Sequence, residues 1–191
     1  MTYKNPNPQG KGLVPVLAAL GGAKSGVIVL PKQVEQIAAE LFTSMFILES
    51  RFSFKPVRGR SYWLYRYGER FQLSLMAPQQ WSVGTFDQVI GCCELHNDLA
   101  WTLTLSEEAS HDQSFMAFIA TRRERFQQAL QASQSLDEAL PVYVQALPFY
   151  QRVFASALAS SLGKSMQLSG IAGLSYQQAQ RQLETIERSY G

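Results

Sequence analysis

The sequence has few of the features that stabilise or anchor a protein from outside its own core. Only two of its 191 residues are cysteines, Cys92 and Cys93, and they are adjacent, so a disulfide between them would be badly strained. A chain without a disulfide framework is typical of a reducing compartment. The first residues show no signal-peptide pattern, and no apolar run approaches the roughly 20 residues of a membrane-spanning helix. We therefore expect a cytoplasmic protein that makes no contact with membranes.

Charged residues and histidines are also scarce. The charged fraction is 17%, and the formal net charge is only +2, so the chain as a whole is not a strong attractor of polyanions. The two histidines, His96 and His111, have no cysteine or second histidine at metal-ligand spacing. The nucleophile-elbow pattern Gly-x-Ser-x-Gly is absent, and residues 22–25 lack the glycine that precedes the lysine of a phosphate loop. The sequence therefore predicts no metal and no cofactor.

One dense block of aromatic and basic residues is present, between Phe54 and Trp81. Residues 51–70 hold six basic side chains and one acidic side chain. Gly68-Glu69 separates two alternating runs, which predicts a tight hairpin with Tyr67 opposite Arg70. Because side chains alternate between the two faces of a strand, the hairpin divides its residues into two sets. The core set is Tyr62, Leu64, Phe71, Leu73 and Leu75, with Arg66 at its edge, and the opposite set is Trp63, Tyr65, Tyr67, Arg70, Gln72 and Ser74.

A second hairpin is expected from residues 88–96 and 100–105, joined by a turn at Asn97-Asp98. Pairing outward from this turn places Cys92 and Glu94 on the core face, in line with Arg66. The face then also contains Ile90, Trp101, Leu103 and Leu105. Together the two hairpins predict a four-stranded antiparallel β-meander.

The rest of the chain is predicted to be mainly helical. Apolar residues at helical spacing predict a helix over residues 31–50, opened by Pro31 and covered on two sides. Residues 106–113 are expected to form a polar loop. Further helices are expected over residues 114–132, 136–162 with a break near Pro148, and 175–190, after a glycine-rich link at residues 163–173. The last helix has heptad spacing, so it is expected to dock on another helix, in this chain or in a second copy.

These elements predict an α+β fold: an antiparallel sheet with an N-terminal packing helix, followed by a helical C-terminal part. The expected organisation is a flexible N-terminal arm at residues 1–12, an α+β domain at residues 13–110, and a helical extension at residues 111–191. We expect a monomer, with the C-terminal helix as the element that could mediate dimerisation.

Several short motifs resemble a known family. They are Phe54-Lys-Pro-Val with Gly59, Tyr62-x-Leu-Tyr65, Leu73-Ser-Leu-Met-Ala-Pro78 with Trp81, and Leu95-x-x-Asp98-x-x-Trp101. In this order they resemble the pattern of domain-of-unknown-function family 2452, over residues 13–101. The resemblance implies no activity, cofactor or partner, so the residues themselves must supply the functional hypothesis.

The aromatic and basic face of the first hairpin is the candidate functional surface. Its expected partner-binding residues are Arg58, Arg60, Trp63, Tyr65, Tyr67 and Arg70. Aromatic and arginine side chains are typical anchors of protein interfaces, so we expect a binding or scaffold protein with a protein partner rather than an enzyme. The first alternative is single-stranded nucleic acid, such as RNA, stacked on the same rings. The second is a small hydrolase-like enzyme with a site near His96 and Asp98. The face could also be covered by helices, which would make its rings ordinary edges of the core.

Overall fold

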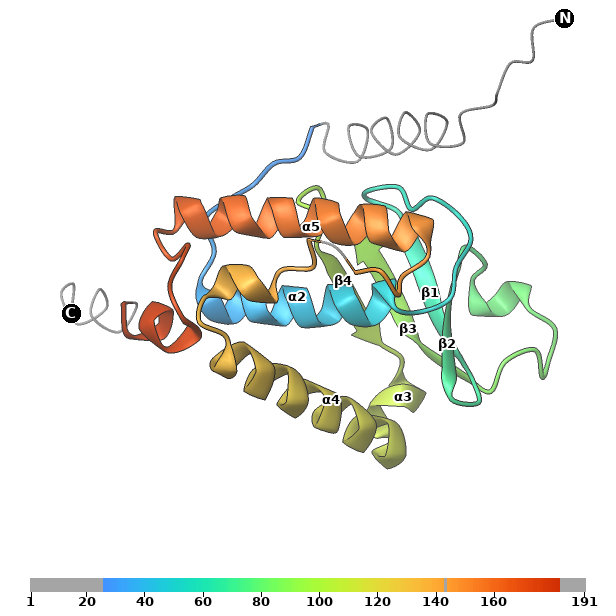
Figure 1. The fold of residues 1–191 in the computed structure, drawn as a ribbon. Helices are drawn as coiled ribbons and strands as arrows, with labels where there is room; N and C mark the ends of the chain where they lie inside the picture. The colour runs from blue at the N-terminus through green and yellow to red at the C-terminus, as the bar shows by residue number, and fades with distance from the viewer. Residues whose placement is uncertain (1–25, 143, 183–191) are drawn as a thin grey trace, which may run out of the picture.

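The computed structural model describes residues 26–142 and 144–182 and shows the expected α+β architecture (Figure 1). Four antiparallel strands form one sheet: β1 (Ser61–Tyr67), β2 (Arg70–Ser74), β3 (Gln88–Leu95) and β4 (Trp101–Leu105). Helix α2 (Val34–Leu48) packs on the sheet, and α5 (Phe149–Leu168) lies beside α2. The short helix α3 (Glu107–His111) and the long helix α4 (Gln113–Ala132) lie between β4 and α5 in the chain. Two 3₁₀ turns occur in the described residues, at Pro78–Gln80 and at Leu136–Ala139.

The first hairpin has the register that the sequence predicted. Tyr67 pairs with Arg70, and the pairing continues through Leu64 and Leu73 to Trp63 and Ser74. Gly68 in the turn has a φ of 58°, a left-handed conformation that glycine adopts at little cost. Of the predicted core set, Tyr62, Leu64 and Leu73 are buried and Phe71 is partly buried, but Leu75 lies beyond the end of β2 and is exposed.

The strand order is β2-β1-β3-β4, which corrects the sequential order of a meander. Strand β3 pairs with β1 instead of β2, so β1 is an interior strand with a partner on each side. The connection from β2 to β3, residues 75–87, must therefore cross β1. It crosses on the face opposite the helices, where Trp81 and Phe86 contact Tyr65. This crossover decides which of the candidate aromatic residues can reach a ligand.

The second hairpin is shifted by one residue from the predicted register. Its loop is Asn97-Asp98-Leu99, because the His96 N–H donates to the Ala100 carbonyl and Leu99 adopts a φ of 71°. A three-residue loop of this kind ends in a left-handed residue, which more often is glycine. The extra residue pairs Leu95 with Trp101 and Cys93 with Leu103.

The shift moves two residues that were predicted to lie on the core face to the opposite face of the sheet. Cys93 and Leu95 point into the core, whereas Cys92 and Glu94 lie on the opposite face, since their neighbours in the strand are buried. Arg66 consequently pairs with Asp112 at 3.4 Å and not with Glu94. Ile90 still reaches the core, because the register between β1 and β3 shifts there by a β-bulge.

Helix α2 begins at Val34, three residues later than predicted from Pro31. Residues 31–33 stay extended because the chain is held elsewhere: the Lys32 N–H donates to Ser169 Oγ at 2.8 Å, and the Ser169 hydroxyl donates to the Lys32 carbonyl at 2.8 Å. The helix buries its apolar residues against both the sheet and α5, as its two apolar stripes predicted.

The helical C-terminal part differs in its boundaries. The expected polar loop contains α3, capped by Ser106. Of the helix predicted over residues 136–162, the described residues before Pro148 form only the 3₁₀ turn at Leu136–Ala139. Helix α5 begins directly after Pro148 and extends into the expected glycine-rich link as far as Leu168. Of the predicted last helix, residues 176–182 are helical, and the rest lies outside the described residues, as does the expected arm at residues 1–12. The buried core includes Phe115, Leu158 and Met166 together with Tyr62 and Leu64, so it spans both sides of the expected boundary at residue 110. Within the described ranges, no helix is both long and apolar enough to cross a membrane.

Candidate functional site

The structure separates the six residues of the predicted binding face. Tyr65 is fully buried beneath the crossover segment, with ring centroids 4.6 Å from Phe86 and 5.8 Å from Trp81. Its hydroxyl donates to the Met76 carbonyl at 2.7 Å, and burial raises the pKa of this phenol. Tyr65 is therefore a packing residue of the second sheet face and not a surface for stacking a ligand.

The other members of the face stay at the surface but do not form a continuous row. Trp63 and Tyr67 are half-buried on either side of Tyr65, and Arg58 is partly buried at a turn. Arg60 and Arg70 are exposed at positions before β1 and at the start of β2. Because the middle ring is covered, the aromatic residues do not provide an uninterrupted platform.

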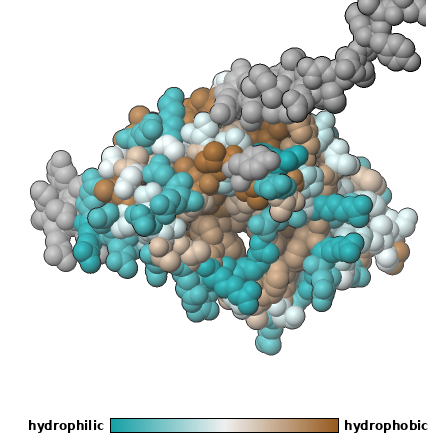
Figure 2. Space-filling model, in the orientation of Figure 1, coloured by the Kyte–Doolittle hydropathy of each residue, from teal (hydrophilic) through white to brown (hydrophobic). Residues whose placement is uncertain are grey.

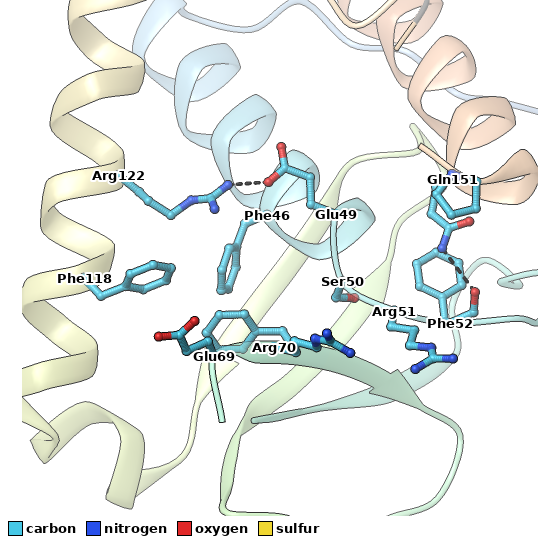
Figure 3. Close-up of a pocket in the computed structure, with 12 residues that line it drawn as sticks. Phe46, Glu49, Ser50, Arg51, Phe52, Glu69, Arg70, Phe118, Arg122 and Gln151 are labelled. Atoms are coloured by element: carbon cyan, nitrogen blue, oxygen red, sulfur yellow. Dashed lines mark hydrogen bonds and ion pairs between the residues drawn. The ribbon is translucent and has the colours of Figure 1, made fainter. Parts of the chain in front are cut away.

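Arg70 instead lines a hollow of about 600 Å³ between the C-terminal end of α2, the β1–β2 hairpin, α4 and the start of α5. We call this the arginine–phenylalanine hollow, after the side chains that define it: Phe46, Phe71, Phe118, Arg51, Arg70 and Arg122 (Figure 3). The space-filling view shows the surface hollowed between α2 and α4, with brown and tan atoms along its walls (Figure 2). The hollow is thus formed by elements that are far apart in the sequence.

The phenylalanine rings hold one another in place. The Phe71 ring lies 5.1 Å from Phe46 in an edge-on arrangement and 5.8 Å from Phe118 in a stacked one, measured between centroids. Both separations lie in the range preferred by aromatic pairs. Phe46 is buried, Phe71 is partly buried, and Phe118 leaves 41% of its surface exposed. The rings therefore offer an ordered apolar wall with one accessible edge.

Arg122 joins α4 to α2 across this wall. Its guanidinium forms an ion pair with Glu49 and lies over the rings of Phe46 and Phe118, at 5.5 and 5.8 Å from their centroids (Figure 3). Cation–π contacts at such distances are weakly attractive at exposed sites. Arg122 is thus already satisfied by protein groups.

Arg51 and Arg70 differ, because within residues 26–142 and 144–182 their guanidinium groups have no hydrogen bond or ion pair. The backbone of Arg51 is nevertheless fixed: its N–H donates to the Phe71 carbonyl at 2.8 Å, and the Leu73 N–H donates to its carbonyl at 3.0 Å. This bridge adds residue 51 to the outer edge of β2. Two exposed, always-charged groups are therefore presented beside the phenylalanine wall, Arg51 from this hydrogen-bonded backbone and Arg70 from the start of β2.

A second hollow, of about 450 Å³, gathers His96 and Asp98, the residues of the hydrolase-like alternative. Lys32 forms ion pairs with both Asp98 and Glu40, and the Asp98 carboxylate also accepts from the Ala100 N–H at 3.1 Å. His96 Nε2 lies 2.9 Å from Thr102 Oγ1, a hydroxyl within reach of a base. In the part of the chain that the structure describes, no carboxylate bonds to His96, so the third group of a triad is not in place.

Within residues 26–142 and 144–182, the cysteines and the remaining acidic residues form no further candidate site. Burial raises the pKa of the Cys93 thiol strongly, which disfavours the reactive thiolate. Cys92 is half-buried on the opposite sheet face, where it pairs with Trp63 and Thr104. Among the described residues, no three metal-ligating side chains come together.

Of the six predicted binding residues, Arg70 lines the hollow, and the other residues that line it were not predicted as site residues. Arg51 belongs to the basic run at residues 51–70, yet nothing in its local sequence joins it to Arg70. Phe118 and Arg122 lie one helical turn apart on α4, and this spacing is a signal that a helix analysis could use. That they face Phe46 and Phe71 depends on how α4 docks.

Comparison with known proteins finds no matching family model, no matching curated protein and no matching solved structure. The resemblance to domain-of-unknown-function family 2452 therefore stays a prediction. The structure does show what the residues of that resemblance do here: Phe54 stacks on Tyr62, Tyr62 meets Trp101, and Tyr65 meets Trp81. In this chain the motifs describe core packing, and the candidate site must be judged on its own geometry.

Proposed function

We propose that this protein is a non-catalytic binding module that holds an acidic segment of a protein partner in the arginine–phenylalanine hollow. The observation that supports the proposal is the pair Arg51 and Arg70, two guanidinium groups without protein partners in the described chain, next to an ordered phenylalanine wall. Carboxylates are the groups that a guanidinium fork binds best, and aromatic rings bury the apolar side chains beside them.

A protein segment fits this hollow better than a fully enclosed small molecule. The exposed edge of Phe118 lies at the wall, and Phe149, which follows the lining residue Pro148, is 38% exposed. Arginine and aromatic residues are enriched at the centres of protein interfaces. The partner class predicted from the sequence is thus kept, while the binding surface moves from the hairpin face to the hollow at its end.

Single-stranded nucleic acid stays an alternative prediction with weaker support. The main support for this prediction was a row of aromatic rings on which bases could stack, but the middle ring, that of Tyr65, is buried. If RNA binds the face nonetheless, the slope of log affinity against log salt should fall in magnitude by roughly 0.7 for each arginine removed. Trp63→Ala should then weaken binding by roughly 1–3 kcal/mol with little change in this slope.

The hydrolase-like alternative rests on the contact between His96 and Thr102. Turnover of a p-nitrophenyl ester that is abolished in both His96→Ala and Thr102→Ala would support it. Equal background hydrolysis by these variants and the wild type would remove it, because a base and its nucleophile act as a unit.

The proposed function is tested with a short fluorescein-labelled peptide in which glutamate alternates with phenylalanine and leucine. Fluorescence anisotropy should show saturable binding, and Arg70→Gln and Arg51→Gln should each weaken it by about 1 kcal/mol, roughly fivefold, as expected for a partly shielded ion pair. Arg60→Gln is the matched control, because Arg60 is exposed but does not line the hollow. Equal affinity for a peptide with lysine in place of glutamate would contradict the proposal.

A further inference from the structure

A third hollow, of about 360 Å³, continues the arginine–phenylalanine hollow along the seam between α2 and α4. The two hollows share Phe46, Glu49 and Arg122 as lining residues. Beyond this shared wall, the third hollow is lined by apolar side chains from α2, α4 and the segment after the 3₁₀ turn: Phe42, Met45, Phe126, Ala139, Leu140 and Val144. We call it the apolar hollow.

The seam is open because α4 touches the body along one narrow stripe. Only Phe115 and Leu130, near its two ends, are buried, while Ile119 and Phe126 pack partly between them. Phe126 lies 5.6 Å from Phe42 between ring centroids, and the Arg123 guanidinium lies over the Phe42 ring at 5.3 Å from its centroid. A helix held at its ends and along one stripe leaves space between contacts, and that space is the two hollows.

The ion pair between Arg122 and Glu49 separates the two hollows, since both residues line each of them. Their side chains are 36% and 42% exposed. An ion pair this exposed contributes little to stability, so a competing carboxylate can replace Glu49 on Arg122 at small cost. The other contacts of Arg122, with the rings of Phe46 and Phe118, do not depend on Glu49.

We infer that the two hollows form one groove for an amphipathic acidic segment of a protein partner. An apolar side chain enters each hollow, and a carboxylate between them takes the place of Glu49 on Arg122. The inference rests on the proposed function, and it adds the pattern apolar–acidic–apolar to the partner's chemistry. It follows from charge. Among the described residues, Arg51, Arg70 and Arg122 line the arginine–phenylalanine hollow against two acidic residues, Glu49 and Glu69, and Glu49 is already paired with Arg122. The charged residues that line the apolar hollow are Glu49 and Arg122 themselves.

The test uses two labelled peptides with the same acidic residues: one with an apolar residue on each side of the central glutamate, and one with alanine on the side distal to Arg51 and Arg70. The two-sided peptide should bind wild-type protein about tenfold more tightly, as expected for the burial of one further large apolar side chain. Ala139→Met, which fills the apolar hollow, should remove this advantage without changing the affinity for the one-sided peptide. Ala132→Met adds the same side chain at the exposed end of α4 and should have no effect.

Glu49→Gln tests the exchange of carboxylates. It frees Arg122, so both peptides should bind about threefold more tightly, whereas Glu124→Gln, an equal charge change on the outer side of α4, should leave affinity unchanged. Equal binding of the two peptides, unaltered by Ala139→Met, would overturn the groove, and no difference between Glu49→Gln and Glu124→Gln would overturn the exchange. If neither peptide binds the wild type, the proposed function itself fails.

Discussion

The arginine–phenylalanine hollow and the hollow at Lys32 use their cations in opposite ways. Lys32 has only 7% of its side chain exposed and is bound by two carboxylates, Glu40 and Asp98. It ties the extended residues before α2 to the β3–β4 loop, so its charge serves the fold. Arg51 and Arg70 are exposed, and the described part of the chain offers their guanidinium groups no partner. The comparison teaches that a buried cation paired with carboxylates is costly to remove, because its partners are then left uncompensated, whereas an exposed cation without a protein partner is available to a ligand.

The largest expected effect is on the Lys32 side of this comparison. Lys32→Met leaves Glu40 and Asp98 close together without a cation, so the free energy of unfolding should fall by about 3 kcal/mol. Urea denaturation followed by tryptophan fluorescence measures this loss. Lys55→Met, at an exposed lysine, is the control and should change stability by less than about 0.5 kcal/mol. A similar small change in both variants would mean that the cation of the Lys32 hollow does not contribute to the stability of the fold.

The pH dependence of stability should separate the two hollows further. Burial alone lowers the pKa of Lys32, but the hydrogen bonds and charges of Asp98 and Glu40 outweigh burial and raise it above its ordinary value of 10.5. The ammonium group therefore stabilises the fold fully below pH 10.5, and this contribution is lost as pH rises through the raised folded-state value.

The difference in unfolding free energy between wild type and Lys32→Met should accordingly shrink above pH 10.5. Denaturation curves from neutral pH to the upper limit of folding measure it. The difference between wild type and Arg70→Met should show no such change, since arginine stays charged throughout. A constant Lys32 difference across this range would contradict the ion-pair explanation.

A smaller effect is expected for Arg122, which lines the proposed binding hollow but already has a protein partner, Glu49. Arg122→Met keeps an apolar side chain against Phe46 and Phe118 and removes the exposed ion pair with Glu49. Thermal unfolding should show a loss of about 0.5 kcal/mol that diminishes at high salt. A loss as large as that of Lys32→Met would show that the pair is structural and would weaken the carboxylate-exchange inference.

The smallest effect on stability is expected at Arg51 and Arg70. Each methionine substitution should change the free energy of unfolding by less than about 0.5 kcal/mol, because neither guanidinium has a protein partner to lose within the described residues. The same two variants should bind the acidic peptide more weakly than the wild type does. Unfolding of either variant at ordinary temperature would indicate that its arginine supports the hairpin edge, and the contrast with Lys32 would disappear.

Local sequence determined the first hairpin and the apolar faces of the helices. Gly68 accepts a left-handed turn, and alternation over four residues on each side then specifies the register and the burial of Leu64 and Leu73. Helix α2 follows in the same way from apolar spacing, apart from its first turn. Both features arise from contacts between residues that are close in the chain, which is why pattern reasoning predicts them.

Only the tertiary structure decided the second register, the strand order and the candidate site. Leu99 adopts a left-handed conformation that its residue type does not predict, and one additional loop residue reverses the faces of Cys92 and Cys93. The pairing of β3 with β1 sends residues 75–87 across Tyr65, which removes a predicted binding residue from the surface. The hollow depends on α4 bringing Phe118 and Arg122 opposite Phe46, at a separation of more than 70 residues. Alternation and spacing constrain near neighbours, but which distant faces meet is determined by the packing of the whole core.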